Sequence, residues 1–265
     1  MGKYRNLSKK RKLARGQLEK IFRTPEHTLI IHYSCESFYD RNNPLSPRVT
    51  SIAVRNLDSG QTKSFSIHLV AERIGHLNSI DQHYDELEKA MLEDFFLTVS
   101  KRQHCQWVHW NMRDANYGFE ALENRFCALG GTISDTVPEL NRIDLSRILV
   151  SIYGTKYISH PRLENIIRHN RITSKDFLTG KEEAAAFENK EFVKLHQSTL
   201  RKVDVLASIA ERAYANDLDT LSTWWDKNGH SIKEWGELIK EHWLISTIVG
   251  LVSVISTVIK IWHWI

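Results

Sequence analysis

The sequence of 265 residues lacks the features that mark several large classes of protein. Its three cysteines form no Cys-x-x-Cys pair, which argues against a disulfide-based scaffold and favours a reducing compartment. It contains neither a Walker-type phosphate loop nor a Gly-x-Gly-x-x-Gly loop, so ATP hydrolysis and dinucleotide redox chemistry are not expected. No apolar segment follows the basic N-terminus, and a secretory signal peptide is therefore not predicted. We also expect no small-molecule cofactor.

Positive charge is concentrated at the start of the chain. Residues 1–23 hold nine Lys and Arg against one acidic residue, Glu19, and so carry a net charge of +8. Because the whole chain carries +4, residues 24–265 carry −4, and the body of the protein is mildly acidic. We interpret residues 1–24 as a basic tail. It could form a helix that lies on an anionic membrane or on nucleic-acid phosphates, or it could be a solvated flexible segment.

Residues 25–216 have the pattern of an α/β domain. Apolar runs and alternation of polar and apolar residues predict strands at 28–33, 49–56, 62–70 and 106–110. Helical spacing of apolar residues predicts helices at 84–100, 117–129, 145–153, 162–169, 174–178, 182–189 and 191–215. The order strand, hairpin, helix, strand, helix predicts a mixed sheet flanked by helices.

This order of elements resembles the ribonuclease-H-like fold of the DEDD 3′–5′ exonucleases. In that family the first strand ends in Asp-x-Glu, and a later short strand is followed by an Asn and then, four residues on, an Asp. The long final helix carries a His five residues before a last Asp. Together these carboxylates hold two metal ions around the scissile phosphate. The resemblance covers residues 27–216 as topology and implies a sheet of this kind.

The first two motifs are altered in this chain. Ser34-Cys35-Glu36 keeps the glutamate of the first motif but has serine in place of the aspartate. Asn111 matches the second motif, but Asp114 comes one position early and Ala115 stands where the aspartate is expected.

The third motif is altered as well. His196 and Asp204 are farther apart than in the family, and Lys202 lies between them. We therefore expect a domain without metal and without enzymatic activity. The alternative is an active exonuclease dependent on Mg²⁺ or Mn²⁺, whose catalytic carboxylates would be Glu36, Asp40, Asp114 and Asp204.

The segment 109–119 carries aromatic, amide and basic side chains around a strand-to-helix turn, where open sheets often bind ligands. A helix N-terminus beside an arginine can hold a phosphate, and an aromatic ring can stack on a base. The candidates for a ligand-binding site are Trp110, Asn111, Arg113, Asn116 and Tyr117. An ordinary capping turn with its aromatic side chains in the core would show the same composition.

Cys105 and His109, with His104, are residue types that bind zinc. No second pair of ligands accompanies them, and a strand points alternate side chains to opposite faces. The sequence therefore predicts no metal site.

An apolar stretch occupies residues 243–265. At about 1.5 Å per residue it is about as long as the hydrocarbon core of a bilayer is thick, and Lys260 is its only fixed charge. Trp243 lies at one end and Trp262 and Trp264 at the other, where interfacial anchors are expected, and Lys260 would reach back to the headgroups. We predict a C-terminal transmembrane helix, with a buried core helix as the alternative.

Small and polar residues recur at steps of three and four in this stretch and would share one helix face. The residues are Ser246, Gly250, Ser253 and Thr257. Such a face lets two transmembrane helices approach closely and form hydrogen bonds, which predicts a homo-oligomer. Residues of these kinds are also common in helices that only anchor a protein.

The chain thus divides into a basic tail (1–24), an exonuclease-like α/β domain (25–216), an amphipathic helical stalk (217–242) and a transmembrane helix (243–265). We expect the domain to sense or bind a protein or nucleic-acid partner that controls activity. A small domain joined to one span resembles the membrane effectors of bacterial antiphage defence systems, which implies self-association that perturbs the inner membrane. The alternatives are a tethered exonuclease and a membrane scaffold. The expected topology is single-pass in the inner membrane with the N-terminal domain in the cytosol.

Overall fold

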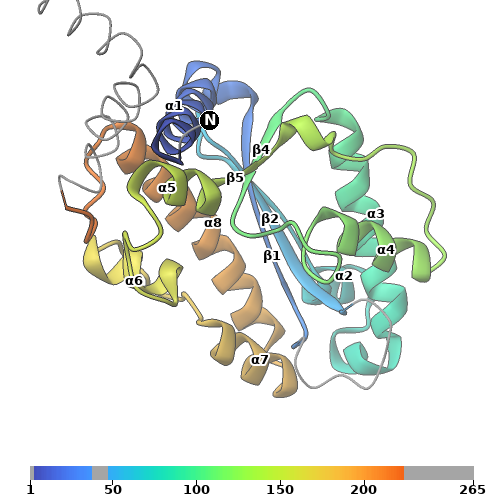
Figure 1. Cartoon of the computed structure of the whole chain (residues 1–265). Coiled ribbons are helices and arrows are strands. Elements are labelled where there is room, and N and C mark those ends of the chain that lie inside the picture. Colours follow the sequence, from blue (N-terminus) through green and yellow to red (C-terminus); the bar gives the residue numbers. More distant parts are fainter. Residues whose placement is uncertain (1–2, 38–46, 224–265) are drawn as a thin grey trace, which may run out of the picture.

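The computed structural model describes residues 3–37 and 47–223, which form an α/β domain with helices on both faces of a five-stranded sheet (Figure 1). The strands are β1 (Thr28–Cys35), β2 (Val49–Asn56), β3 (Thr62–Ser66), β4 (Gln106–His109) and β5 (Arg142–Asp144). Their order in the sheet is β3-β2-β1-β4-β5. The predicted α/β class with a mixed sheet is confirmed.

The sheet combines an antiparallel meander with a parallel half. β1, β2 and β3 pair antiparallel in sequence, while β4 lies parallel to β1 and β5 parallel to β4. The short turn after Asn56 joins β2 directly to its neighbour β3. The parallel strands instead need crossover connections that contain helices. This order and these directions are compatible with a ribonuclease-H-like fold.

One face of the sheet is covered by α2 (Ile67–Ile74), α3 (Tyr84–Lys101), α4 (Phe119–Ala128) and α7 (Gly180–Glu188). The other is covered by α1 (Lys3–Arg23), α5 (Leu145–Tyr153), α6 (Arg162–His169) and most of α8 (Phe192–Tyr214). Alternate residues of β1 enter opposite cores, as in Ile30 on the α8 side and Ile31 on the α3 side. Three short 3₁₀ turns complete the described elements: η1 (Pro25–His27), η2 (Leu77–His83) and η3 (Glu139–Asn141).

The basic N-terminal segment is part of the packed body, which differs from the separate tail predicted for residues 1–24. α1 lies against α5 and α8 and buries one apolar stripe, made of Ala14, Leu18 and Ile21. Arg15 donates to the Ala213 carbonyl at 3.0 Å, and the Phe22 ring stacks on Tyr214 with centroids 4.4 Å apart. A stripe of apolar residues at helical spacing becomes buried wherever a complementary apolar surface is available.

The strand predicted over 62–70 is half wrong, because the chain turns into α2 after Ser66. Phe65, Ile67 and Leu69 alternate in the sequence, but Leu69 is 41% exposed. The buried set is Ile67, Val70 and Ala71, at helical spacing, and Gly75 ends the helix with φ of +82°. This segment is helical because the helical spacing of its apolar residues, rather than their alternation, lets them pack into the core.

Several other elements differ from prediction. β5 was not predicted, since it has three residues and only Ile143 is buried. Residues 174–178 and 217–223 are not helical. The start of the predicted stalk instead joins the body, because Leu218 is buried and Leu221 N donates to the Tyr157 carbonyl at 2.8 Å.

Within the described ranges, no helix has both the length and the hydrophobicity required to cross a bilayer. The predicted transmembrane helix at 243–265, with its association face and its tryptophan anchors, lies outside the described residues. The same holds for the predicted stalk from residue 224 onward and for Asp40.

Candidate functional site

The carboxyl ends of the parallel strands β1, β4 and β5 meet at one edge of the sheet, where open α/β sheets bind ligands. Two cavities open there. The first, of about 520 Å³, lies beyond β1 and against α7; we call it the β1 cavity. The second, of about 530 Å³, lies beyond β4 and β5; we call it the β4–β5 cavity.

A buried ion pair lies beside the β1 cavity. Lys202 of α8 is 5% exposed, and its Nζ lies 2.6 Å from Oε2 of Glu183, which lines the cavity from α7. The other carboxylate oxygen of Glu183 accepts hydrogen bonds from the Ser34 and Ser198 hydroxyls, at 2.7 and 3.1 Å. Both oxygens of the carboxylate are therefore engaged, and its charge is balanced by the lysine.

Neutral hydroxyl groups extend this network between the sheet and α8. Thr199 Oγ1 lies 3.1 Å from the Ser34 hydroxyl and 2.7 Å from the Ser51 hydroxyl. These residues join β1, β2 and α8, which carry Ser34 and Lys202, two of the departures from the exonuclease pattern in the sequence. The described network thus joins four hydroxyls, one ammonium group and one carboxylate.

Two divalent cations require several anionic oxygens around them. Glu183 is the one carboxylate in this described network, and the Lys202 ammonium lies against it. A further cation would meet a positive charge at a few ångströms in a poorly solvated site, which is unfavourable by several kcal/mol on the order-of-magnitude scale of Coulomb's law. The residues present therefore do not fit the metal pair of the exonucleases.

Glu36, the surviving member of the first motif, has a structural partner. Its carboxylate accepts from Arg48 Nε at 2.6 Å, and its backbone N–H donates to the Arg48 carbonyl at 2.9 Å. The Arg48 guanidinium in turn lies over the rings of Tyr84 and Phe187, at 4.9 and 5.0 Å. Glu36 thus helps to hold the start of β2 beside the end of β1.

The other carboxylates of the nuclease alternative lie elsewhere. Asp204 pairs with Arg55 at 3.1 Å, and Arg55 is opposite Ile30, four residues before Ser34 along β1. At about 3.3 Å per residue this separates Asp204 from the Ser34 end by on the order of 13 Å. Asp114 borders the β4–β5 cavity and accepts from the Asn116 backbone N–H at 2.8 Å. The described members of this predicted set, Glu36, Asp114 and Asp204, are therefore not brought together.

An uncharged histidine lies under the β1 cavity. His32 is buried between β2 and β4, and its Nδ1 is 3.3 Å from the Tyr117 hydroxyl, while its Nε2 has no partner. Burial holds the pKa of His32 well below its usual value, and the charge of Lys202 lowers it further. The Tyr117 hydroxyl donates to the Tyr33 carbonyl at 3.2 Å. The ring of Tyr117 stacks on that of Tyr33, with centroids 4.5 Å apart, and both rings line the cavity.

The turn that carries Tyr117 depends on glycine at the next position. A Cβ on Gly118 would lie 2.9 Å from the Met112 carbonyl carbon, too close for any side chain. The Gly118 N–H donates to the Tyr33 hydroxyl at 2.9 Å. This close approach fixes the tyrosine pair at the mouth of the β1 cavity.

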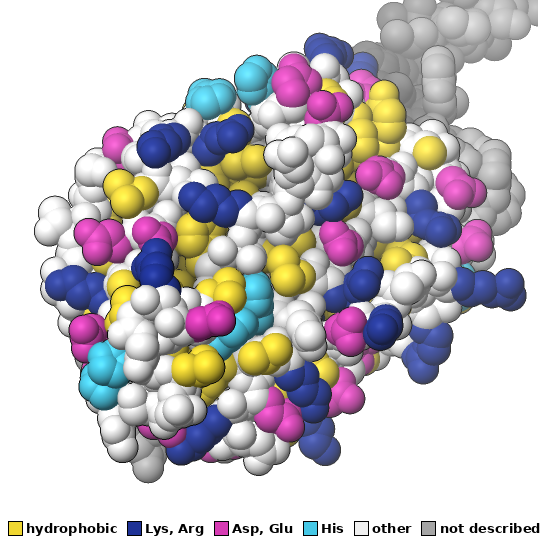
Figure 2. Space-filling model, turned by 180° about the vertical axis from the view of Figure 1, so that it is seen from behind, with side chains coloured by type: hydrophobic (Ala, Val, Ile, Leu, Met, Phe, Trp, Pro, Cys, Tyr) yellow, Lys and Arg dark blue, Asp and Glu magenta, His cyan; other side chains and the backbone are white. Residues whose placement is uncertain are grey.

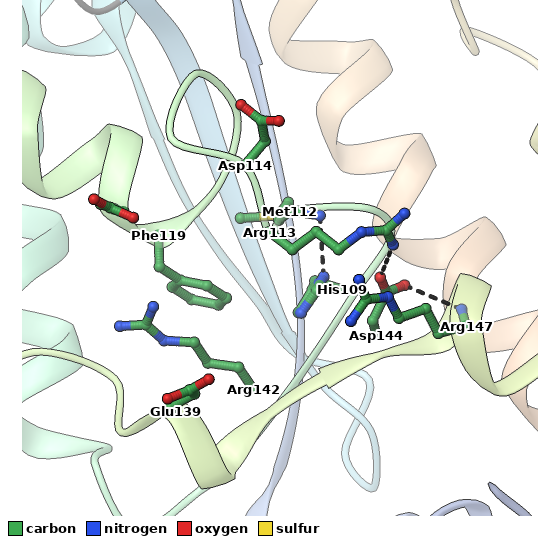
Figure 3. A pocket seen from close by; sticks show the side chains of 10 residues that line it. His109, Met112, Arg113, Asp114, Phe119, Glu139, Arg142, Asp144 and Arg147 are labelled. Atoms are coloured by element: carbon green, nitrogen blue, oxygen red, sulfur yellow. Dashed lines mark hydrogen bonds and ion pairs between the residues drawn. The ribbon is translucent and has the colours of Figure 1, made fainter. Parts of the chain in front are cut away.

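Arginines and acidic groups line the β4–β5 cavity (Figure 3). Arg113 forms an ion pair with Asp144, the N-cap of α5, and the Arg142 guanidinium lies over Phe119 at 4.9 Å. His109 Nδ1 accepts from the Met112 N–H at 3.1 Å. Burial lowers the pKa of His109 to about 4. The nearby arginines lower it as well, whereas the negative charge of Asp144 raises it. The cavity therefore presents a neutral imidazole between charges of both signs.

The structure places the five predicted ligand-binding residues in different environments. Trp110 is 8% exposed and packs in the core on the α8 side, so its ring offers no stacking surface, and that prediction is wrong. Arg113 borders the β4–β5 cavity and Tyr117 the β1 cavity. Asn111, with φ of +58°, and Asn116 are exposed and line neither of these two cavities.

Sequence reasoning missed Glu183 and the cavity residues of β5. Glu183 belongs to a helix that begins with a capping box at Thr179, which identifies a helix start but not the neighbour of its second glutamate. A usable signal was present in α8, where Ser198, Thr199 and Lys202 interrupt the apolar side of the helix. Polar residues on a buried helix face require partners, which predicts a polar network.

The described part of the face shown in Figure 2 intermixes Lys and Arg with Asp and Glu, without a broad patch of one sign. That face therefore lacks the electrostatic footprint of a nucleic-acid groove. Comparison with models of known protein families, with curated proteins and with solved structures found no match in any of the three searches.

Proposed function

We propose that this protein is a non-enzymatic membrane effector whose α/β domain is a ribonuclease-H-like binding module. The observation that carries the first half of this proposal is the Lys202–Glu183 ion pair beside Ser34, which takes the place of a metal centre. The buried ammonium supplies from within the chain the positive charge that the exonucleases take from metal ions. The domain then retains the cavities of such a fold as binding surfaces for a partner.

Cleavage assays test the enzymatic part. Labelled single-stranded DNA and RNA are incubated with the full chain in Mg²⁺ or Mn²⁺, beside the Glu36→Gln variant prepared in the same way. We expect equal background cleavage from both proteins. Metal-dependent cleavage that disappears in Glu36→Gln would establish the tethered exonuclease instead.

Tyr117 is the proposed contact for the partner. Its ring stacks on the buried ring of Tyr33, and its hydroxyl is already used in a hydrogen bond to the Tyr33 carbonyl, so the half-buried ring of Tyr117 offers apolar surface at the β1 cavity. Replacing Tyr117 by Leu is expected to weaken partner capture at least about tenfold, the effect of losing one interface aromatic. Leu140, which is 93% exposed and is not among the residues that line this cavity, provides the control as Leu140→Ser.

The membrane part rests on the sequence of residues 243–265 and on the charge of α1. The face of α1 opposite its buried stripe exposes Lys9, Lys12 and Lys20, which suits contact with anionic headgroups. We propose that the C-terminal helix anchors the chain in the inner membrane and self-associates through Ser246, Gly250, Ser253 and Thr257, and that this association perturbs the membrane.

Expression in bacteria with a membrane-potential dye tests this part. The full chain is expected to depolarise cells, and Gly250→Leu/Ser253→Leu is expected to prevent it while the protein stays in the membrane fraction. Ile248→Phe/Ile255→Phe enlarges two residues on the opposite helix face and should leave depolarisation unchanged. If the association-face variant remains as active as the original chain, the span is only an anchor, as in a scaffold.

A further inference from the structure

Three metal-ligating side chains converge at the amino end of the sheet, at the opposite end of β1 from its cavity. They are His27, His104 and Cys105, and one ligand atom of each lies within 4.8 Å of the other two. The imidazoles of His27 and His104 meet edge to face, with centroids 5.4 Å apart and an interplanar angle of 78°. In the described part of the chain, this is the one group of three or more such residues at this spacing.

The parallel pairing of β1 and β4 creates this convergence. Thr28 pairs with Gln106, so the residues just before the two strands, His27 and Cys105, enter the sheet side by side. They are 78 positions apart in the sequence, and no local spacing pattern could join them. His104, next to Cys105, completes the group.

Both segments are held in place by hydrogen bonds. The Thr28 hydroxyl lies 3.0 Å from the Ile21 carbonyl and 3.1 Å from the Thr24 carbonyl, which fixes the turn that carries His27. On the other side, the Asn141 amide donates to the Gln103 carbonyl at 2.7 Å, and Cys105 N donates to the Arg102 carbonyl at 3.0 Å. The three ligands are thus presented by ordered backbone.

A thiolate and two imidazoles form a ligand set suited to zinc and related borderline cations. In tetrahedral zinc sites, with Zn–S of about 2.3 Å and Zn–N of about 2.0 Å, neighbouring ligand atoms are roughly 3.3–3.6 Å apart. Rotation of the two exposed imidazoles can bring the present atoms to that spacing. We propose that His27, His104 and Cys105 bind one Zn²⁺, with water as the fourth ligand.

The chemistry of Cys105 fits this assignment. The side chain is fully buried, whereas His27 and His104 are exposed, and the exposed Arg102 side chain lies beside the thiol and would have to move into solvent when a cation binds. Binding converts the thiol to a thiolate and releases one proton to solvent. The bound ion would link η1 to the loop before β4 and so tie the two central parallel strands together, a structural role independent of the proposed function.

Other histidine pairs in the described chain provide an internal comparison. His76 and His83 stack with centroids 3.8 Å apart, closer than His27 and His104, but no thiol completes their set. If paired imidazoles alone explained metal binding, His76 and His83 would bind equally well.

Cobalt titration of the metal-stripped full chain tests the proposal, because a thiolate–Co²⁺ bond gives a charge-transfer band that imidazoles alone do not. We expect one equivalent of Co²⁺ with this band, and displacement of Co²⁺ by Zn²⁺. Cys105→Ala should abolish the band. His104→Ala, at an exposed position that leaves the core intact, should weaken Zn²⁺ binding by more than about 100-fold, beyond the usual cost of losing an outer partner.

The matched controls are Cys127→Ser, which removes an exposed free cysteine, and His76→Ala/His83→Ala, which removes an imidazole pair. Both should retain the band and the affinity of the original chain. The proposal is overturned if the original chain shows no band, if the band survives Cys105→Ala, or if His104→Ala binds as tightly as the controls.

Discussion

The two ends of the central sheet differ in whether a buried positive charge of the chain is present. At the carboxyl end of β1, a lysine of the chain itself is buried against Glu183 and saturates the one carboxylate of the network. At the amino end, two exposed imidazoles and a buried thiol converge, and the Arg102 side chain beside the thiol is exposed rather than buried in an ion pair. The ammonium group of Lys202 neutralises Glu183 without a metal ion. The three neutral ligands at the amino end would add to the stability of the fold only when a metal ion is bound.

Removal of the built-in charge should have the largest effect. Lys202→Met keeps most of the side-chain volume but leaves Glu183 partly buried without its cation, which is expected to lower the free energy of unfolding by about 3 kcal/mol. Urea unfolding followed by tryptophan fluorescence measures this. Lys194→Met, on the exposed side of the same helix, breaks a surface pair with Glu191 and should change stability by less than about 0.5 kcal/mol.

The double variant Lys202→Met/Glu183→Gln should recover much of the loss, because no buried charge then remains unpaired. If instead the effects of the two single substitutions simply add, the ion pair is not the origin of the loss. The charge of Lys202 would then not be what stabilises the carboxyl end of the sheet.

Zinc should stabilise the amino end by a slightly smaller amount. At a free Zn²⁺ concentration of about 100 times the dissociation constant, linkage adds about 2.7 kcal/mol to the free energy of unfolding. Thermal unfolding with and without Zn²⁺ should show this gain in the original chain and in Lys202→Met, but not in His104→Ala. A zinc response lost in Lys202→Met would mean that the two ends are not independent.

Acid should destabilise the carboxyl end through His109. Its folded pKa of about 4 lies below the unfolded value of about 6.5, so the unfolded chain binds the proton first and stability is lost as pH falls between these values. From pH 7 to pH 5 the loss from this group is about 2 kcal/mol. His109→Asn keeps an acceptor for the Met112 N–H and should remove this part of the pH dependence, leaving the parts due to His32 and His196, whereas His76→Asn, at a half-exposed position outside this cavity, should leave it unchanged.

The smallest effect is expected for Asp204→Asn. Its carboxylate is 43% exposed and pairs with Arg55 and Arg201, and surface pairs of this kind contribute within about 0.5 kcal/mol. Mn²⁺ should shift the melting temperature of neither the original chain nor this variant. A Mn²⁺ shift that disappears in Asp204→Asn would indicate that the acidic residues do assemble into a metal site.

Much of the fold was predictable, because strong periodicity and clear terminators agree with the final packing. β2, α5 and α6 have the predicted bounds, and β1, α3 and α8 differ by one or two residues. Failures occurred where local patterns were ambiguous or short. The alternation through Phe65, Ile67 and Leu69 concealed α2, and three residues with one buried side chain were too few to reveal β5.

The candidate sites were less predictable than the fold. The sequence identified Ser34 and Lys202 as departures from the exonuclease pattern, but not their shared partner Glu183, which α7 brings to them. Of the two interpretations of the aromatic residues, the core one applies to Trp110, which directly follows β4 and packs on the α8 side. Likewise, the neighbours of Cys105 in sequence suggested no metal site, since His27 belongs to η1, the turn before another strand.

By itself, the sequence determined the α/β class, most helices and strands, the absence of intact exonuclease motifs and the expectation of an apolar C-terminal helix. These properties depend on residue type and on short-range spacing. Only the tertiary structure decided that α1 belongs to the body, that Lys202 meets Glu183 and that His27 meets Cys105. Each of these contacts joins residues that are distant in the chain, and their geometry is set by how helices pack on the sheet and how β1 registers with β4.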